Sequence, residues 1–188
     1  MGRLIYGSMS ITLDGYFADA DGGIGWTVPE DEVHRLANRQ VKEHAAIVMG
    51  RRLYEMMVPY WHDVLKSGEG GEIEQEFARV WDEIPKFVAS RTLDGVHETC
   101  ELIEGDAIDW IARKKLETEG DIEVSGIDLA AQVEAAGLID VYRFNLLPVV
   151  LGGGKPFFRD DLVQRDLELT DLRRFPAGTV ALEYTVKR

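Results

Sequence analysis

The sequence contains only one cysteine, Cys100, in 188 residues. A single thiol excludes an intrachain disulfide and every metal site that needs several cysteines. The four histidines, at positions 34, 44, 62 and 97, lack the spacing of a zinc-binding helix. We therefore expect no metal centre in this protein.

Basic side chains are also scarce. The chain has 21 lysines and arginines against 34 aspartates and glutamates, which gives a net charge of −13 and an isoelectric point near 4.7. Such a chain is repelled by phosphate-rich surfaces, so we expect neither nucleic acid nor a membrane as a partner. Against this background, a local cluster of arginines becomes informative.

Long apolar runs are absent from the sequence. The first apolar stretch, residues 4–12, is too short for a membrane span or a signal peptide, so we expect a cytoplasmic protein. The composition, 45% hydrophobic and 29% charged, is that of a globular protein. A length of 188 residues suits a single domain, 1–188, with a substantial core.

Strand-like and helix-like patterns alternate along the chain. Short apolar runs predict strands at 3–11, 45–49, 86–91, 121–126 and 138–154. Amphipathic patterns predict helices at 30–44, 53–57, 72–83, 106–117 and 127–137. Two alternating segments after residue 166, with a turn at 176–178, predict an antiparallel pair. This order is typical of a three-layer α/β fold, in which helices cover both faces of a doubly wound, mostly parallel sheet with an antiparallel C-terminal edge.

Three of the expected strands end in residues that can bind a phosphate. Gly50-Arg51-Arg52 follows the second strand, Ser90-Arg91 ends the third, and Ser125-Gly126 precedes a helix. Guanidinium groups and a hydroxyl suit a phosphate monoester, and the free N–H groups of a helix N-terminus attract anions. Ligands of open α/β sheets bind beyond the carboxyl ends of the strands, so we expect a phosphate-bearing ligand there. The alternative is that each arginine cluster is a solvated helix start.

Two familiar nucleotide-binding patterns are missing. Neither GxGxxG nor GxxxxGK[ST] occurs, so neither Rossmann nor P-loop binding is indicated. The glycine-rich segment LGGGKPFF lacks a serine or threonine after its lysine and a helix behind it, and we interpret it as a chain reversal.

Four segments resemble those of dihydrofolate reductases in the same order: GWTVPEDE, IVMGRRLYE, VASR and VSGIDLA. A fifth segment, LAAQVEAAGLIDVYRFNLLPVVLGGGKPFF, is closer to a sister group. It resembles the C-terminal reductase domain of the bifunctional deaminase-reductase of riboflavin biosynthesis and the stand-alone bacterial proteins related to it. The zinc motif of the deaminase half is absent. The resemblance covers almost the whole chain and implies a dihydrofolate reductase-like fold.

The resemblance implies that the three strand ends bind NADPH. Arg51 matches the arginine that grips the cofactor phosphates, and Ser90-Arg91 matches the residues that hold the 2′-phosphate. Ser125-Gly126 matches a Gly-Gly pair before the helix that faces the pyrophosphate. The cofactor-binding residues implied in this way are Gly50, Arg51, Arg52, Ser90, Arg91, Ser125, Gly126, Ile127, Asp128 and Leu129.

Two of these positions depart from the pattern of the related reductases. Leu53 stands where a threonine is usual, which removes a hydroxyl contact. Ser125 stands where a glycine is usual, and its side chain could keep the cofactor away from the backbone. Dihydrofolate reductases carry a cis peptide bond within the matching Gly-Gly pair, so the resemblance predicts a cis bond between Ser125 and Gly126.

The resemblance also implies a substrate site. Reduction of a C=N bond takes a hydride from the nicotinamide and a proton on nitrogen. Asp31 matches the carboxylate that dihydrofolate reductases have in the pterin pocket, which makes it the candidate acid. The alternative is an acidic first helical turn, shared with Glu30 and Glu32. Trp26 and Tyr54 are candidate walls for a flat heterocycle, unless they pack in the core.

Three functions remain open on the sequence. The first is an NADPH-dependent reductase of a pteridine-like heterocycle, dihydrofolate included. The second is the ribosylaminopyrimidine reductase of riboflavin synthesis, and the third is a non-catalytic nucleotide-binding module with the same fold. A second basic cluster, reserved for a substrate phosphate, favours the riboflavin reaction. The residues available for it are Arg143, Lys155, Arg159, Arg173 and Arg174.

The segment FNLLPVVLGGGKPFF carries more apolar side chains than one edge strand should expose. They are Leu146, Leu147, Val149, Val150, Leu151, Phe157 and Phe158. Pro148 interrupts the strand ladder, and the tail that follows offers a free strand edge. We therefore expect a homodimer built through the C-terminal part. The alternative is that neighbouring helices bury the run within one subunit.

Overall fold

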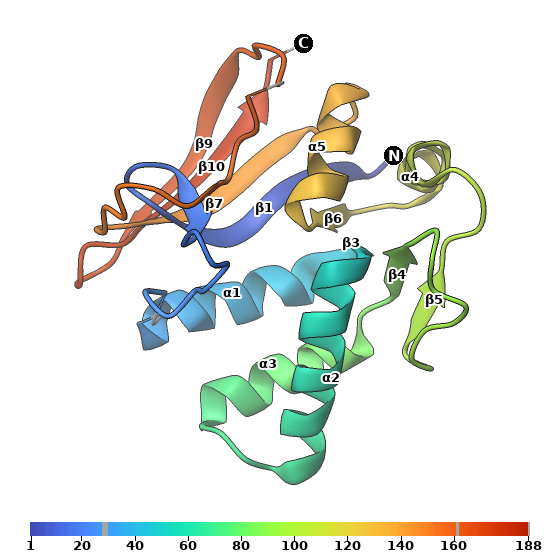
Figure 1. Ribbon diagram of the computed structural model, residues 1–188, viewed down its shortest axis with the longest axis horizontal. Helices are drawn as coiled ribbons and strands as arrows, with labels where there is room; N and C mark the ends of the chain where they lie inside the picture. The colour runs from blue at the N-terminus through green and yellow to red at the C-terminus, as the bar shows by residue number, and fades with distance from the viewer. Residues whose placement is uncertain (28–29, 161, 188) are drawn as a thin grey trace.

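The structure, a computed structural model, describes residues 1–27, 30–160 and 162–187 (Figure 1). Its strands are β1 (Arg3–Thr12), β2 (Tyr16–Ala18), β3 (His44–Gly50), β4 (Lys86–Ala89), β5 (Cys100–Leu102), β6 (Asp121–Ser125), β7 (Val141–Leu147), β8 (Lys155–Pro156), β9 (Leu167–Arg174) and β10 (Val180–Val186). Its helices are α1 (Asp31–Glu43), α2 (Arg51–Ser67), α3 (Glu72–Glu83), α4 (Ala107–Glu117) and α5 (Ile127–Ala135).

Within the described part of the chain, one sheet has eight strands in the order β5-β4-β3-β6-β1-β7-β10-β9. The strands from β5 to β7 in this order pair in parallel. β10 and β9 follow antiparallel at one edge. β2 and β8 form a separate antiparallel ribbon. The predicted sheet, mostly parallel with an antiparallel C-terminal edge, is therefore confirmed.

Helices cover both faces of this sheet and give the fold three layers (Figure 1). Successive residues of a strand point to opposite faces. Accordingly, Ala46 and Val48 of β3 join the core under α4 and α5, whereas Ile47 and Met49 join the core under α2 and α3. α1 lies on the same side as α2 and α3 and packs on β10 through Leu36. No helix among the described residues is both long enough and apolar enough to span a bilayer.

Two predicted helix ends are confirmed in detail. The carboxylate of Asp106 accepts hydrogen bonds from the N–H groups of Ile108 and Asp109, at 2.9 and 3.0 Å, and so begins α4. Beyond α5, Gly137 has a φ of 69° and donates its N–H to the carbonyl of Glu134 at 2.7 Å. Glycine adopts this left-handed conformation freely, which is why it closes the helix.

Other boundaries differ from those predicted, for local reasons. α2 extends to Ser67 through Pro59, a residue that normally ends a helix. Burial of Val58 and the packing of Trp61 on Phe77, with 4.4 Å between the ring centroids, hold both sides of the proline in the helix. β7 ends at 147 because the proline that follows cannot donate to the ladder. β2, β5 and β8 have three residues or fewer, too few for a periodic pattern.

Lys86 ties the start of β4 to the end of α3. Its side chain is almost fully buried, and Nζ donates hydrogen bonds to the carbonyl oxygens of Trp81, Asp82 and Ile84. Burial lowers the pKa of this ammonium group. The cation nevertheless fits the site, because the last carbonyls of a helix lack partners within the helix and carry partial negative charge.

Replacement of Lys86 by methionine should destabilise the protein. The substitution keeps the apolar stem but removes the donor of three carbonyls, and each buried acceptor left without a donor costs about 1–3 kcal/mol. Relief from burying a charge offsets part of this, so we expect a net loss of at least about 1 kcal/mol in the free energy of unfolding by urea. The matched control is Lys66→Met, because Lys66 is exposed in the last turn of α2. Equal urea midpoints for Lys86→Met and the wild type would contradict this role.

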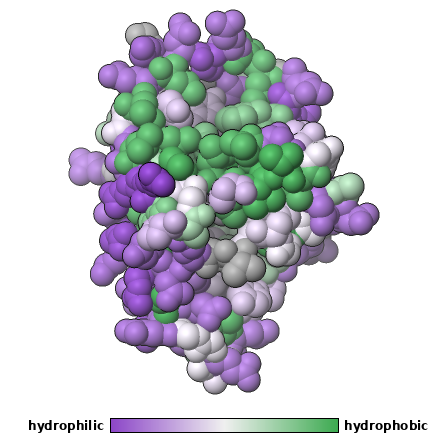
Figure 2. Space-filling model, turned by 90° about the vertical axis from the view of Figure 1, so that its left-hand side faces the viewer, coloured by the Kyte–Doolittle hydropathy of each residue, from purple (hydrophilic) through white to green (hydrophobic). Residues whose placement is uncertain are grey.

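The apolar C-terminal run is partly buried within the monomer. Leu147 and Phe157 lie in the core and need no partner, contrary to the expectation that the whole run exceeds what one subunit can cover. Val150 and Phe158 are exposed. Figure 2 shows hydrophobic residues gathered in a band across the face that lies on the left of Figure 1.

We propose a homodimer built through β9, the strand at the antiparallel edge of the sheet. This strand exposes Leu169 and Leu172. Light scattering should then give twice the 21.1 kDa of one chain. The double variant Leu169→Glu/Leu172→Glu should give a single chain, because charges on a strand edge oppose pairing. Leu116→Glu, at an exposed leucine of α4, is the control and should leave the mass unchanged. A wild-type mass of 21.1 kDa at micromolar concentration would exclude this dimer.

Candidate functional site

The three strand ends that the sequence singled out lie side by side. β4, β3 and β6 are neighbours in the sheet, with Gly50 paired to Ala89 and Met49 to Ser125. A Cβ atom on Gly126 would lie 3.6 Å from the backbone nitrogen of Gly50. The N-termini of α2 and α5 therefore meet at one edge of the sheet. These residues, 50–52, 90–92 and 125–128, lie at the C-terminal ends of the strands, and we call them the carboxyl edge.

Both helices at the carboxyl edge begin without a side-chain cap. The N-cap residues are Gly50 for α2 and Gly126 for α5, and neither helix has a side-chain hydrogen bond at its cap. Asp106 caps α4 with its side chain, whereas α1 and α3 also begin without a side-chain cap. The first N–H groups of α2 and α5 lack helical partners, and with the positive ends of the helix dipoles they favour an anion.

The loop after β4 is bound to the start of α2. Arg51 donates from Nη1 to Oγ1 of Thr92 at 2.9 Å. Ser90 accepts the backbone N–H groups of Thr92 and Leu93 at its hydroxyl oxygen, both at 3.2 Å. Ser90 thus shapes the turn that carries Arg91, whose side chain is exposed. Two predicted phosphate-binding segments are joined by this contact.

Two arginines meet one aspartate at the start of α5. Arg52 Nη1 lies 3.6 Å from one carboxylate oxygen of Asp128, and Arg159 Nη1 lies 3.5 Å from the other. All three side chains are largely exposed, and exposed ion pairs contribute little to stability. These contacts with Asp128 are therefore no strong obstacle to an anionic ligand. Arg159, which the sequence offers as a residue for a substrate phosphate, lies beside Asp128 at the carboxyl edge.

Ser125 does not obstruct this edge. Its side chain is buried, and its hydroxyl donates a hydrogen bond to the carboxylate of Glu123 on the same face of β6. The predicted cis bond between Ser125 and Gly126 is wrong, because no described residue has a cis peptide bond. Gly126 instead has a φ of 92°, a conformation open to glycine, and this turns the chain from β6 into α5.

The other residues at this edge supply packing and backbone. Leu53, where related reductases have threonine, lies with its Cβ 3.7 Å from the position that a Cβ of Gly126 would occupy. Leu129 is buried in the core and approaches Gly50 in the same way, also at 3.7 Å. Of the predicted cofactor residues, Leu129 can therefore offer only its backbone, and Ile127, which is half-buried, packs against the same core.

A chain of buried polar groups lies behind Ser125. Oε2 of Glu123 is 3.1 Å from Nδ1 of His44, and Nε2 of His44 is 3.2 Å from Nη1 of Arg143. Arg143 in turn donates to Glu183 at 2.9 and 2.6 Å. We call Ser125, Glu123, His44, Arg143 and Glu183 the buried polar chain. Sequence reasoning missed it, because its members come from β3, β6, β7 and β10.

The basic residues available for a second cluster lie on several elements. Arg143 is buried and bound to Glu183, so it is unavailable to a substrate phosphate. Arg173 lies 3.1 Å from Asp171 on β9, and Lys155 lies on β8. With Arg159 at the start of α5, these residues belong to separate elements.

The predicted substrate residues have different surroundings. Asp31 is the first residue of α1 and is exposed. Trp26 is half-buried, and its indole N–H is buried with no hydrogen-bond partner among the described residues. Tyr54 packs with the core under α2 and α3, and its hydroxyl oxygen accepts the backbone N–H of His97 at 3.0 Å. Tyr54 therefore holds the loop after β4, whereas the indole N–H of Trp26 is enclosed and, like those of Trp61 and Trp81, has no partner among the described residues.

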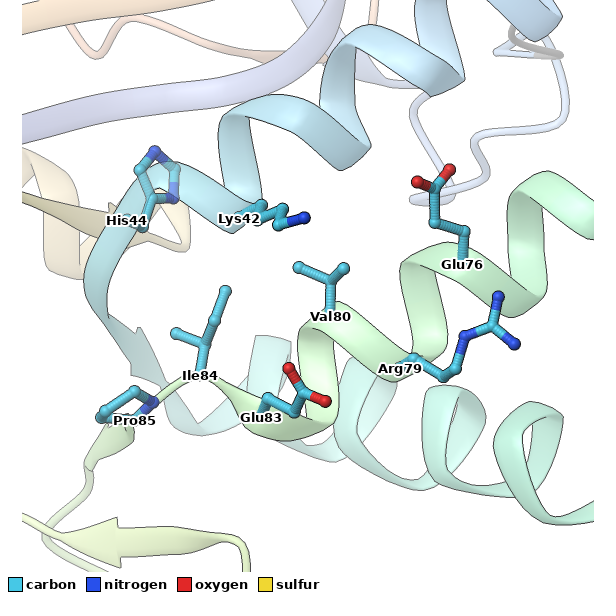
Figure 3. A pocket seen from close by; sticks show the side chains of 8 residues that line it. All are labelled: Lys42, His44, Glu76, Arg79, Val80, Glu83, Ile84 and Pro85. Carbon is cyan, nitrogen blue, oxygen red and sulfur yellow. The ribbon is translucent and has the colours of Figure 1, made fainter.

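A cavity of about 450 Å³ lies at the opposite end of β3 (Figure 3). The end of α1, the start of β3 and the C-terminal half of α3 line it. Its charged groups, Lys42, Arg79, Glu76 and Glu83, carry no net charge, so the cavity does not favour a phosphate. His44 in its wall is also a member of the buried polar chain. No three His, Cys, Asp or Glu side chains in the described part of the chain are grouped to hold a metal ion.

Solved structures of several proteins share this fold. A riboflavin biosynthesis protein of Shewanella sp. PV-4 superimposes with a TM-score of 0.73 at 22% identity, over 99% of each chain. A deaminase/5-amino-6-(5-phosphoribosylamino)uracil reductase of Thermotoga maritima gives a TM-score of 0.65 at 16% identity, over 99% of this chain and 57% of that one. Dihydrofolate reductase of Enterococcus faecalis, complexed with NADP(H), gives 0.61 at 15% identity, over 99% and 97% of the two chains.

Sequence comparison gives the family. The uncharacterized protein YyaP of Bacillus subtilis (strain 168) is 25% identical over 183 residues, which cover 97% of this chain and 94% of that protein. Residues 3–181 match the family model described as the RibD C-terminal domain. This match covers nearly the whole sheet and its helices, and the chain therefore belongs to the RibD C-terminal domain family.

Proposed function

We propose that the protein is an NADPH-dependent reductase of a ribosylaminopyrimidine or pteridine-like substrate, similar to 5-amino-6-(5-phosphoribosylamino)uracil reductase. The observation that carries this proposal is the meeting of two uncapped helix N-termini with Arg51, Arg52 and Arg159 at the carboxyl edge. Membership of the RibD C-terminal domain family supports a reductase of the riboflavin-biosynthesis type. The fold shared with a dihydrofolate reductase that was solved with NADP(H) supports the cofactor.

The groups at the carboxyl edge suit a dinucleotide with several phosphates. We assign the pyrophosphate to the start of α5, where free N–H groups, Arg52 and Arg159 lie together. We assign the 2′-phosphate to Ser90 and Arg91, beside Arg51. When bound, NADPH supplies the hydride.

Two residues are assigned to the substrate. Trp26 has an indole N–H without a partner among the described residues, and this group can donate to a carbonyl or ring nitrogen of a heterocycle. Asp31 is the proposed source of the proton on the substrate nitrogen. Because Asp31 is exposed in the protein, the bound substrate itself must exclude water from its carboxyl group.

The cofactor assignment predicts a preference for NADPH over NADH. Calorimetry should give at least a tenfold lower Kd for NADPH, equivalent to about 1.4 kcal/mol. Arg91→Ala should remove most of the preference, because the 2′-phosphate loses its guanidinium partner. Arg113→Ala, at an exposed arginine of α4, should leave it unchanged. Affinity should also fall with added salt, since exposed charges are screened. Equal affinities for the two cofactors would refute the assignment.

The proposed reaction is tested by steady-state turnover. The protein should oxidise NADPH in the presence of 5-amino-6-(5-phosphoribosylamino)uracil, or in the presence of dihydrofolate. Asp31→Asn should lower kcat by a factor of about 10²–10⁴, which is typical for loss of a general acid, while the Kd of NADPH stays unchanged. Binding of NADPH without turnover of either substrate would favour the non-catalytic nucleotide-binding module. An unchanged kcat in Asp31→Asn would exclude Asp31 as the acid.

A further inference from the structure

We propose that Asp128 is an autoinhibitory residue of the carboxyl edge. In the ligand-free protein its carboxylate pairs with the arginines that we assign to the cofactor pyrophosphate, and it thereby weakens the binding of every ligand that carries this group. The inference rests on the proposed function, because it takes NADPH to be the ligand of this edge. It concerns the Asp128 side chain, in addition to the backbone that the start of α5 offers to a phosphate.

Asp128 brings together two arginines from different segments of the chain. One oxygen of its carboxylate lies 3.6 Å from Nη1 of Arg52, the second residue of α2, and the other lies 3.5 Å from Nη1 of Arg159, which follows β8. Arg51 is paired differently, because its partner Glu55 lies one turn further along the same helix, at 3.4 Å. The bridge at Asp128 therefore joins α5 to two separate segments, and it is no ordinary pair on one helix surface.

The carboxylate of Asp128 resembles a ligand phosphate in its chemistry. Both present negatively charged oxygens to a guanidinium group. Asp128 is the second residue of α5, where the positive end of the helix dipole also favours negative charge. The protein thus supplies, from its own chain, an anion for the same groups that we assign to the pyrophosphate.

This internal anion can be displaced. The side chain of Asp128 is 69% exposed and that of Arg52 is 89% exposed, so water screens their attraction. Rotation of Asp128 toward solvent frees the arginines, but its charge stays near any phosphate bound at the start of α5. Binding is then opposed twice, because only the molecules with free arginines are competent and because the carboxylate repels the phosphate. Asp128 therefore lowers the affinity without closing the site.

Asp128→Asn tests this role, because it keeps the size of the side chain and removes its charge. Calorimetry in low-salt buffer should give a Kd of NADPH about fivefold lower than that of the wild type, which is the factor that one unit charge at roughly 4 Å exerts in water. The Kd of NADH should fall by the same factor, since both cofactors carry the pyrophosphate. Added salt should reduce this gain. In turnover, KM for NADPH should fall without a rise in kcat.

A purely structural role predicts the opposite change in affinity. Loss of a negative charge from the first turn of α5 should lower the urea midpoint slightly. If Asp128 only positioned the arginines, the variant would also bind NADPH more weakly. In a double-mutant cycle, Arg52→Gln should raise the Kd of NADPH more in the Asp128→Asn background than in the wild type, because Arg52 no longer has an internal partner there. Equal losses in the two backgrounds would contradict the pairing.

The control is Asp109→Asn, which removes an exposed acid from the first turn of α4 and should leave the Kd of NADPH unchanged. An equal gain in affinity in Asp109→Asn would mean that net charge alone is responsible, and it would overturn the inference. An unchanged or higher Kd in Asp128→Asn would also overturn it, while the proposed function would stand. A wild-type protein that fails to bind NADPH would overturn the proposed function and this inference together.

Discussion

The turn at Gly126, between β6 and α5, is the constraint on which the carboxyl edge depends. A Cβ at position 126 would lie 3.6 Å from the Gly50 nitrogen, which is ordinary contact, so space alone does not demand a glycine there. The φ of 92° at Gly126 does, because a side chain strains that conformation. The turn it permits brings the start of α5 beside the start of α2. Both helices then present uncapped N–H groups to the same volume of solvent, within reach of three arginines.

Charge at this edge runs against the charge of the whole protein. A chain with a net charge of −13 repels phosphates at long range, and the arginines reverse this only locally. Asp128 pairs with two of them on the surface, where an ion pair is weak. In the buried polar chain, Ser125, Glu123, His44 and Arg143 are almost without solvent, so each of these groups needs a polar neighbour. We expect a ligand phosphate to replace Asp128 as the partner of the exposed arginines. The buried groups beneath them keep their contacts in this exchange.

The sequence predicted those features that depend on local chemistry. Runs of apolar residues located the strands, Asp106 and Gly137 marked helix ends, and three strand ends identified one edge of the sheet. Contacts between distant segments could not be predicted in the same way. Arg159 reaches Asp128 from 31 residues away, and Arg143 reaches His44 from 99 residues away. Charged residues on a strand normally indicate a face open to solvent, so Glu123 and Arg143 gave no sign of burial.

The resemblance to known reductases misled where this chain departs from them. It implied a cis bond at Ser125-Gly126, whereas the positive φ of Gly126 already provides the turn. The hydroxyl oxygen of Tyr54 accepts the amide N–H of His97, and the assignment of its ring to the substrate stays a prediction. The two departures at the edge itself agree with each other. Leu53 replaces a hydroxyl by an apolar contact on Gly126, and Ser125 turns its hydroxyl toward Glu123. With both hydroxyls withdrawn, binding at the starts of α2 and α5 depends on backbone N–H groups and guanidinium groups. If the carboxyl edge binds phosphate as proposed, it does so through its charge more than through directed hydroxyl contacts, and we expect the affinity to fall with ionic strength.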